Sequence, residues 1–492
     1  MKDLKEKTIR GGVARIGAQG AQFLLRVVSL MVLGRLLDPK DFGLVGMVTA
    51  FTGVLTLFRD FGLSSAAVQR KDVTKEQIST LFWINILVGV LLALLSIAMA
   101  PALAGFYHEP RLSKVTAVLA TGFLFNAAGV QHSVLLQRQM RFTALAVIGT
   151  VSLVIGSAVA ICGALAGYGY WALVAMTVIS PLIYTVCVWL TTSWIPGLPH
   201  RQVGMKSMMR FGGTITMNGL VVYIASNFEK VLIGRYWGAD AIGIYGRAYQ
   251  LINIPTDNLN QSVGEVAFSA LSRVQDDPPR LRSYFLKGYS FVLALTLPLT
   301  FACAFFADDI IYVLLGPKWK EAAPLFRLLA PTILVFAIAN PLSWLLTSIG
   351  LVGRNLRIAL FIAPTMILGY VLGLHYGPKG VAFAYSAVLM LWLVPLIAWC
   401  VYDTVVSFWD ILITVSRPLA SSIVASGCAY GVQFLWAQSL PPLPRLVLET
   451  SVLLIVYAGM LFYVMGQRTV YMDLFRDLRG RSSTEKNALA LV

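Results

Sequence analysis

Four polar residues interrupt an otherwise apolar stretch near the N-terminus. They are Arg15, Gln19, Gln22 and Arg26. At 100° per residue this spacing places all four on one face of a helix. Arg26 falls near the middle of a stretch that is long enough to cross a membrane. An arginine facing lipid at that depth costs at least about 2.5 kcal/mol, so we expect its guanidinium group to face a hydrated cavity or an anion.

The chemistry of the guanidinium group favours an anion for Arg26. Its donors form a planar fork, and it keeps its charge at any relevant pH, which suits a phosphate. The alternative is an internal ion pair that holds helices together, with Asp60, Asp257 or Glu229 as the partner. Arg15 lies nearer the end of the stretch, where its side chain could instead extend to the membrane surface.

Two further polar faces are expected later in the chain. In the first, Tyr223, Asn227 and Lys230 share one side of a helix near residues 209–235. The second follows near residues 240–270, with Arg247, Gln250 and Asn253 along roughly one side. Asp257 and Glu265 continue this side and are our candidates for a coupling proton or cation, unless arginine partners keep them ionised.

Composition identifies the elements that must position these residues. Hydrophobic residues make up 58% of the chain and charged residues only 13%, half the usual share of a soluble protein. Apolar blocks of about 20 residues recur without strand-like alternation, so we predict an all-α polytopic membrane protein. About fourteen spans are expected, near residues 12–37, 42–66, 77–106, 115–136, 142–166, 168–194, 209–235, 240–270, 284–308, 322–349, 355–375, 379–402, 411–437 and 444–466.

The formal net charge of +16 reflects membrane topology rather than a nucleic-acid surface. Lys and Arg gather in alternate loops and near both ends of the chain, and this bias predicts that both termini are cytoplasmic. Lone polar residues inside apolar spans, such as Asn126 and His132, are expected to form hydrogen bonds between helices. Lys318-Trp319-Lys320 is expected to anchor the outer membrane surface.

An internal repeat appears when the chain is aligned with itself at an offset of 200 residues. Residues 34–46 then overlie residues 234–246, with identities at 34/234, 35/235, 43/243 and 46/246. Chance matches of glycine and leucine are common between membrane segments, so coincidence is the alternative. Parallel repeats with a site at their interface are a transporter architecture.

Several segments together resemble a known family. They are Gly34-Arg35-Leu36-Leu37-Asp38-Pro39-Lys40-Asp41-Phe42-Gly43, Gln137-Arg138-Gln139-Met140-Arg141-Phe142, Asn227-Phe228-Glu229-Lys230-Val231-Leu232-Ile233-Gly234-Arg235 and Leu315-Gly316-Pro317-Lys318-Trp319. Their order and spacing resemble the polysaccharide-transporter branch of the multidrug/oligosaccharidyl-lipid/polysaccharide exporter superfamily, the colanic-acid-exporter-like flippases above all. The resemblance runs from about residue 8 to about residue 330.

The resemblance implies two six-helix bundles in a V around a central cationic cavity, which admits undecaprenyl-diphosphate-linked sugars by alternating access. On this basis we expect an N-terminal bundle over residues 1–200, a second bundle over 201–402, an extra helix pair over 403–466 and a cytoplasmic tail over 467–492. The resemblance carries no catalytic motif. The cavity residues are therefore those chosen above from their spacing.

The expected function is translocation of lipid-linked oligosaccharide across the bacterial inner membrane, for export of a surface polysaccharide. Membrane lipid is an expected partner, with polysaccharide polymerase or export machinery as a further one. No phosphate loop, HExxH, paired CxxC or GxSxG motif occurs, so we expect neither enzyme activity, nor a cofactor, nor a metal site. The alternatives are a multidrug or cation antiporter of the same superfamily and a membrane enzyme of polysaccharide assembly. Arg26 argues against the first, and short outer loops argue against the second.

Overall fold

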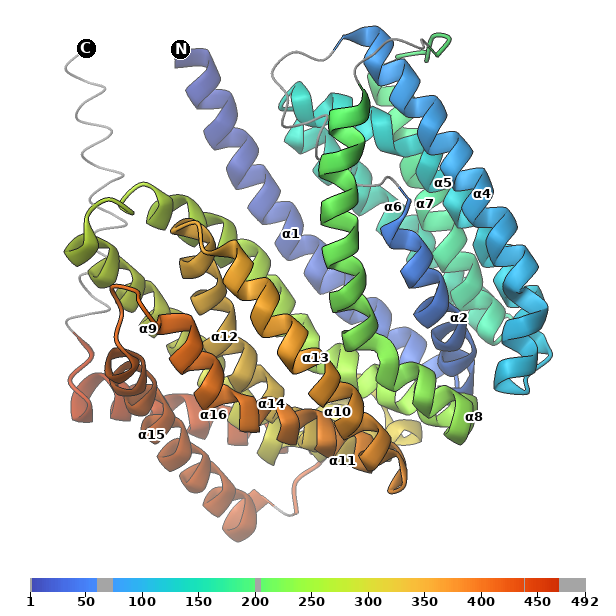
Figure 1. Ribbon diagram of the computed structural model, residues 1–492. Coiled ribbons are helices and arrows are strands. Elements are labelled where there is room, and N and C mark those ends of the chain that lie inside the picture. The colour runs from blue at the N-terminus through green and yellow to red at the C-terminus, as the bar shows by residue number, and fades with distance from the viewer. Residues whose placement is uncertain (1, 60–73, 200–204, 438, 469–492) are drawn as a thin grey trace. The chain divides into compact units, whose positions relative to one another are not determined.

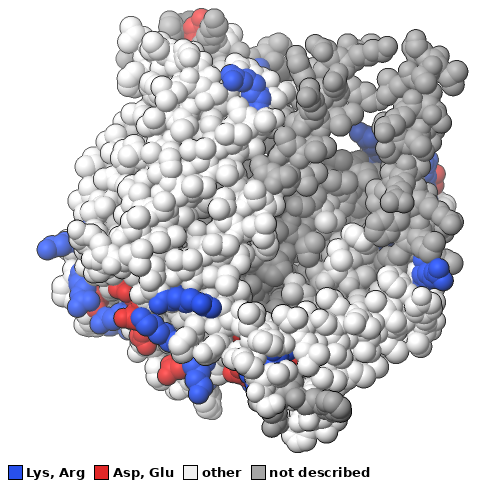
Figure 2. Space-filling view, turned by 180° about the vertical axis from the view of Figure 1, so that it is seen from behind, with Lys and Arg blue, Asp and Glu red and all other residues white. Residues whose placement is uncertain are grey.

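The computed structural model describes the backbone of residues 2–59, 74–199, 205–437 and 439–468, and every regular element in these ranges is a helix. Eleven of these helices are long and apolar enough to cross a membrane, so the chain is a multi-pass membrane protein. Figure 2 shows that a broad area of one face carries no Lys, Arg, Asp or Glu, while charged side chains gather at the edges. Such an uncharged band suits contact with lipid.

The helices follow one another along the chain. In order they are α1 (Lys2–Leu36), α2 (Pro39–Leu57), α4 (Lys75–Tyr107), α5 (Arg111–Arg138), α6 (Phe142–Leu165), α7 (Tyr170–Thr192), α8 (Met205–Ser272), α9 (Pro278–Phe305), α10 (Ala307–Leu315), η1 (Pro317–Trp319), α11 (Ala322–Leu329), α12 (Pro331–Ser348), α13 (Val352–Leu374), α14 (Gly377–Val401), α15 (Phe408–Val432), η2 (Gln433–Ala437), α16 (Pro442–Gly459) and η3 (Met460–Val464).

The all-α polytopic fold is confirmed, whereas the count of fourteen spans remains a prediction. The eleven apolar helices match eleven of the expected spans. The other three correspond to α1 and to the two parts of α8, which are helical but include side chains outside the described set. Gly238 separates the two parts of α8, because its φ of 79° lies in the left-handed region that favours glycine.

The chain forms two compact units. Unit 1 comprises residues 1–246 and 314–319, and unit 2 comprises residues 247–313 and 320–492. In unit 1, α4 packs along α5, α6 packs along α7, and α1 lies against α6 (Figure 1). In unit 2, α15 packs against both α9 and α16, and α13 packs along α14.

The repeated glycines meet each other inside unit 1. A methyl group added at Gly43 of α2 would lie 1.7 Å from the carbonyl oxygen of Ala239, and one added at Gly243 would lie 1.9 Å from the carbonyl oxygen of Pro39. The two contacts are reciprocal, because Ala239 and Pro39 occupy equivalent places in the repeat. Only glycine allows the backbones to approach so closely. The repeat therefore corresponds to a symmetric helix crossing, which we call the glycine crossing.

The prediction that Lys318-Trp319-Lys320 anchors the chain at the outer membrane surface is wrong for Trp319. The Trp319 side chain is fully buried, its indole N–H donates to the carbonyl oxygen of Gly34 at 2.6 Å, and its ring meets that of Phe42 edge-on. Lys318 pairs with Asp38 at 2.8 Å. Sequence position suggested the membrane surface, but the long-range contact with Gly34 places this tryptophan in the interior of unit 1.

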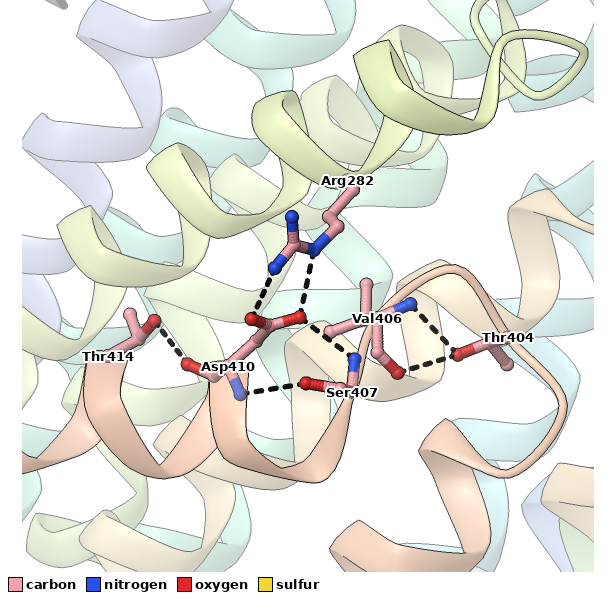
Figure 3. Close-up of polar contacts among 6 residues, drawn as sticks. All are labelled: Arg282, Thr404, Val406, Ser407, Asp410 and Thr414. Atoms are coloured by element: carbon pink, nitrogen blue, oxygen red, sulfur yellow. Dashed lines mark hydrogen bonds and ion pairs between the residues drawn. The ribbon is translucent and has the colours of Figure 1, made fainter.

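Unit 2 fixes the start of α15 with a capping box and an arginine. The Asp410 backbone N–H donates to the Ser407 hydroxyl, and the Ser407 backbone N–H donates to the Asp410 carboxylate (Figure 3). Arg282 of α9 donates two hydrogen bonds to the same carboxylate, at 2.9 and 2.5 Å (Figure 3). A bidentate pair of this kind sets the position of α15 against α9.

Candidate functional site

Along the polar stripe of α1, Gln22 packs against a neighbouring helix whereas Arg26 is exposed. Gln22 donates through its side-chain amide to the carbonyl oxygen of Ala146 at 3.3 Å and to the hydroxyl of Thr150 at 3.2 Å, both on α6. Gln19 is partly buried, and Arg26, one turn beyond Gln22, is exposed. The described part of the stripe, from Gln19 to Arg26, therefore runs along the edge of the contact between α1 and α6, with the charge of Arg26 outside that contact.

The ion pair proposed as the alternative role of Arg26 is not formed with Glu229. Among the described residues Arg26 has neither an ion pair nor a hydrogen bond through its side chain. Glu229 is fully buried, and neither of its carboxylate oxygens has a hydrogen-bond partner in the described part of the chain. The side chains of Asp60 and Asp257, the other two partners considered, lie outside the described set.

The three residues predicted on the first part of α8 form a connected polar row. The Lys230 ammonium group donates to the Asn227 side-chain oxygen at 2.7 Å, and the Asn227 amide donates to the backbone carbonyl of Tyr223 at 3.0 Å. The Tyr223 hydroxyl reaches α2, where it donates to the carbonyl oxygens of Thr49 and Ala50, each at 3.4 Å. This row fixes the position of a partly buried ammonium group in unit 1.

The predicted residues on the second part of α8 belong to unit 2. Arg247 donates a hydrogen bond to the side-chain oxygen of Gln250. Asn253 is partly buried, and its backbone carbonyl accepts from the Thr256 hydroxyl at 2.9 Å. A single site made of Arg247, Gln250 and Asn253 together with the polar residues of unit 1 remains a prediction. The side chains of Arg15, Asp257 and Glu265 lie outside the described set, so their roles stay predictions.

Sequence reasoning did not select Arg59, which follows the end of α2. It falls inside the span expected near residues 42–66, to which no polar face was assigned. In the structure the guanidinium group of Arg59 donates to the side-chain oxygen of Asn126 at 3.2 Å, in the interior of unit 1. The available signal was Asn126 itself, a polar residue in an apolar span; its long-range partner is Arg59, just beyond the end of α2, rather than a residue within another helix.

Comparisons with known proteins agree on a family and on a fold. Residues 32–324 match the family described as polysaccharide biosynthesis protein. The chain is 31% identical to the teichuronic acid biosynthesis protein TuaB of Bacillus subtilis (strain 168), over 65% of this chain and 66% of that protein. It is 24% identical to the lipopolysaccharide biosynthesis protein WzxC of Escherichia coli (strain K12), over 78% of this chain and 79% of that protein.

Among solved structures, the fold is similar to that of the lipid II flippase MurJ in an inward closed conformation. The TM-score is 0.76 at 14% sequence identity, and the match covers 93% of this chain and all of the other. At this identity the likeness concerns the fold alone.

Proposed function

Because the chain belongs to the polysaccharide biosynthesis protein family, we propose that it is a flippase for lipid-linked oligosaccharide. In this proposal it moves undecaprenyl-diphosphate-linked repeat units across the bacterial cytoplasmic membrane by alternating access, for export of a surface polysaccharide. Both termini lie in the cytoplasm, and the two six-helix bundles, over residues 1–200 and 201–402, alternate around a central cavity. Polysaccharide polymerase or export machinery is the partner on the outer side.

The exposed charge of Arg26 is the main support for this proposal. Its charge stands on an exposed part of α1, one of the predicted membrane spans, without an acidic partner among the described residues. Such a charge is stabilised by a phosphate-bearing cargo in a hydrated passage and destabilised by lipid. Lys230, held by Asn227, supplies a second cation in the same unit. Two cations suit a diphosphate better than the organic cation of a multidrug antiporter.

The names of the relatives support the same class of cargo. Teichuronic acid and lipopolysaccharide, in the names of the two relatives, are surface glycans, and lipid II, in the name of the structural neighbour, is a lipid-linked saccharide. All three names are consistent with a saccharide carried on a lipid.

The proposal is tested in a strain that lacks the gene and expresses variants from a plasmid. We expect the deletion strain to accumulate lipid-linked repeat units inside the cell and to lose its surface polysaccharide. Arg26→Ala should fail to restore export at normal protein levels in the membrane, because the anion loses its guanidinium partner. Arg26→Lys should restore part of export, since it keeps the charge but not the planar fork.

Arg111→Ala is the matched control, because Arg111 is an exposed arginine whose pairing with Glu109, at 3.6 Å, is that of a surface ion pair. We expect normal export from this variant. Full export by Arg26→Ala would remove Arg26 from the site. A deletion strain with no accumulated lipid-linked glycan would refute the flippase function itself.

A further inference from the structure

A pocket lies inside unit 1, apart from the polar stripe of α1. It is bounded by Arg59 after α2 and by residues of α5, α6 and α7, and its volume is about 530 Å³. Pockets of roughly 300–1,000 Å³ accommodate small ligands, and this one is too small for an oligosaccharide carried on a polyprenyl chain. We call it the Arg59 pocket.

One cation faces this pocket, and it is incompletely satisfied. A guanidinium nitrogen of Arg59 donates to the Asn126 side-chain oxygen at 3.2 Å, whereas the buried Nε–H has no acceptor among the described residues. A buried donor without a partner is costly, and one on a charged group more so. None of the described residues that line the pocket is an aspartate or glutamate, so they offer no carboxylate for this donor.

The neighbours of Arg59 hold it in place without neutralising it. The Asn126 side-chain amide donates to the carbonyl oxygen of Gly122 at 2.8 Å, which leaves the Asn126 side-chain oxygen directed at the guanidinium group. Ser133 of α5 and Tyr184 of α7 share a hydrogen bond of 3.1 Å, and the buried Ser180 hydroxyl of α7 has no partner in the described part of unit 1. Hydroxyl groups and a fixed cation are the usual donors to a phosphate group.

The pocket also has apolar lining residues, and these indicate which kind of anion it would bind. Val130, Leu153 and Pro181 line it together with the polar groups. A phosphate that carries an ester-linked apolar group satisfies both parts of this lining, whereas free inorganic phosphate satisfies only the polar part. The charge pattern of the loops places Arg59 toward the cytoplasmic side of the membrane, within reach of lipid headgroups of the inner leaflet.

We propose that the Arg59 pocket is a binding site for the phosphate headgroup of an anionic membrane lipid. The Arg59 guanidinium group binds a phosphate oxygen through its free Nε–H, and the hydroxyl of Ser180 donates a further hydrogen bond. This site is separate from the transported cargo, because it lies inside one bundle and holds only a headgroup. Its role is to bind a resident lipid that fills the polar interior of unit 1.

The proposal is tested by lipid binding to the purified full-length protein in detergent, measured by native mass spectrometry. Phosphatidylglycerol and phosphatidylcholine are offered at equal concentration. We expect the wild-type protein to retain phosphatidylglycerol preferentially. Arg59→Gln should weaken this binding about tenfold, the effect of one lost charge-assisted hydrogen bond. Arg59→Lys should retain part of the preference, since it keeps the charge.

Arg111→Gln is the matched control and should bind as the wild type does. If Arg59→Gln does not fold, Asn126→Asp neutralises the cation in place and should abolish the preference. Inorganic phosphate is added in a second series, as a competitor. Displacement of the lipid by millimolar phosphate would assign the site to the free anion and overturn the lipid headgroup. Equal retention of phosphatidylglycerol by the wild type and Arg59→Gln would overturn the site. Lipid retention and its displacement by phosphate are measured without any export assay. Failure of this proposal can therefore be distinguished from failure of the proposed flippase function.

Discussion

The glycine crossing and the Arg59 pocket are two regions of unit 1 with opposite packing. At the crossing, Gly43 and Gly243 bring two helix backbones so close that a single methyl group on either would overlap a carbonyl oxygen. At the pocket, α5, α6 and α7 border a volume of about 530 Å³, and buried polar atoms there have no partner in the described part of the chain.

The comparison shows that small residues and polar residues have different roles in a bundle of membrane helices. Glycine at a crossing removes side-chain volume, so the helices gain van der Waals contact that a larger residue would prevent. Serine, asparagine and arginine around a hollow keep hydrogen-bonding capacity, which only a ligand or water can fill. We therefore expect substitutions at the crossing to act on folding and substitutions at the pocket to act on binding.

The largest effect is expected from Gly243→Ala. The new methyl group would lie 1.9 Å from the carbonyl oxygen of Pro39, and the backbone there cannot move without parting the helices. We expect a loss of about 3 kcal/mol in the free energy of unfolding, at the upper end for overpacking. Thermal unfolding of the purified protein in detergent measures this loss.

Gly246→Ala is the control for this prediction, because Gly246 lies one turn further along the same helix and a methyl group added there would have no described neighbour within 4 Å. It should be neutral or stabilising by about 0.5 kcal/mol, since alanine is the better helix former. Equal unfolding temperatures for the two variants would show that the crossing is not tightly packed.

A smaller effect is expected at Gly53, where α2 receives the side chain of Tyr223. A methyl group at Gly53 would lie 1.8 Å from the Tyr223 hydroxyl oxygen, which is the far end of a side chain and can be displaced. Gly53→Ala should cost about 1–2 kcal/mol, through the clash and the lost hydrogen bonds to α2.

Tyr223→Phe removes the overlapping oxygen, so a double-mutant cycle tests the contact. The combined variant should be more stable than the sum of the two single losses predicts, by about 0.5 kcal/mol or more. Strict additivity in thermal unfolding would mean that the two residues do not touch.

The smallest effect on stability is expected at the pocket. Tyr184→Phe removes one hydrogen bond to Ser133, of 3.1 Å, at a place where water can replace it. We expect a cost of about 1 kcal/mol or less in thermal unfolding. Ser152→Ala, which loses only a bond to its own helix at Ile148, should lie within about 0.5 kcal/mol of the wild type. A loss at Tyr184 as large as that at Gly243 would contradict the contrast between the two regions.

Much of the fold was predictable, because a segment that crosses the membrane must be helical and apolar. A helix that crosses lipid must be apolar over about 20 residues, so the eleven apolar helices follow from hydropathy without knowledge of their contacts. The shared face of Tyr223, Asn227 and Lys230 was also expected from their spacing along one helix, whereas the hydrogen bonds that connect them were not predicted.

The candidate site was less predictable, because its features depend on pairs of residues far apart in the chain. Trp319 was assigned to the membrane surface from its flanking lysines, yet the carbonyl oxygen of Gly34 accepts its N–H in the interior. Arg59 lies within the span expected near residues 42–66 and was given no role there, and only its contact with Asn126 on α5 reveals a partly buried cation facing other helices. Periodicity along a helix gives no information on which neighbouring helix a side chain meets.

The sequence by itself determined that this protein is a polytopic helical membrane protein, and which faces of its helices carry polar groups. Both properties follow from the local free energy of placing each residue in lipid. The tertiary structure alone decided that Gln22 packs on α6 while Arg26 stays exposed, that Gly43 and Gly243 occupy one crossing, and that Arg59 borders a pocket. These outcomes depend on how helices distant in the chain pack together, which the hydropathy of one segment does not encode.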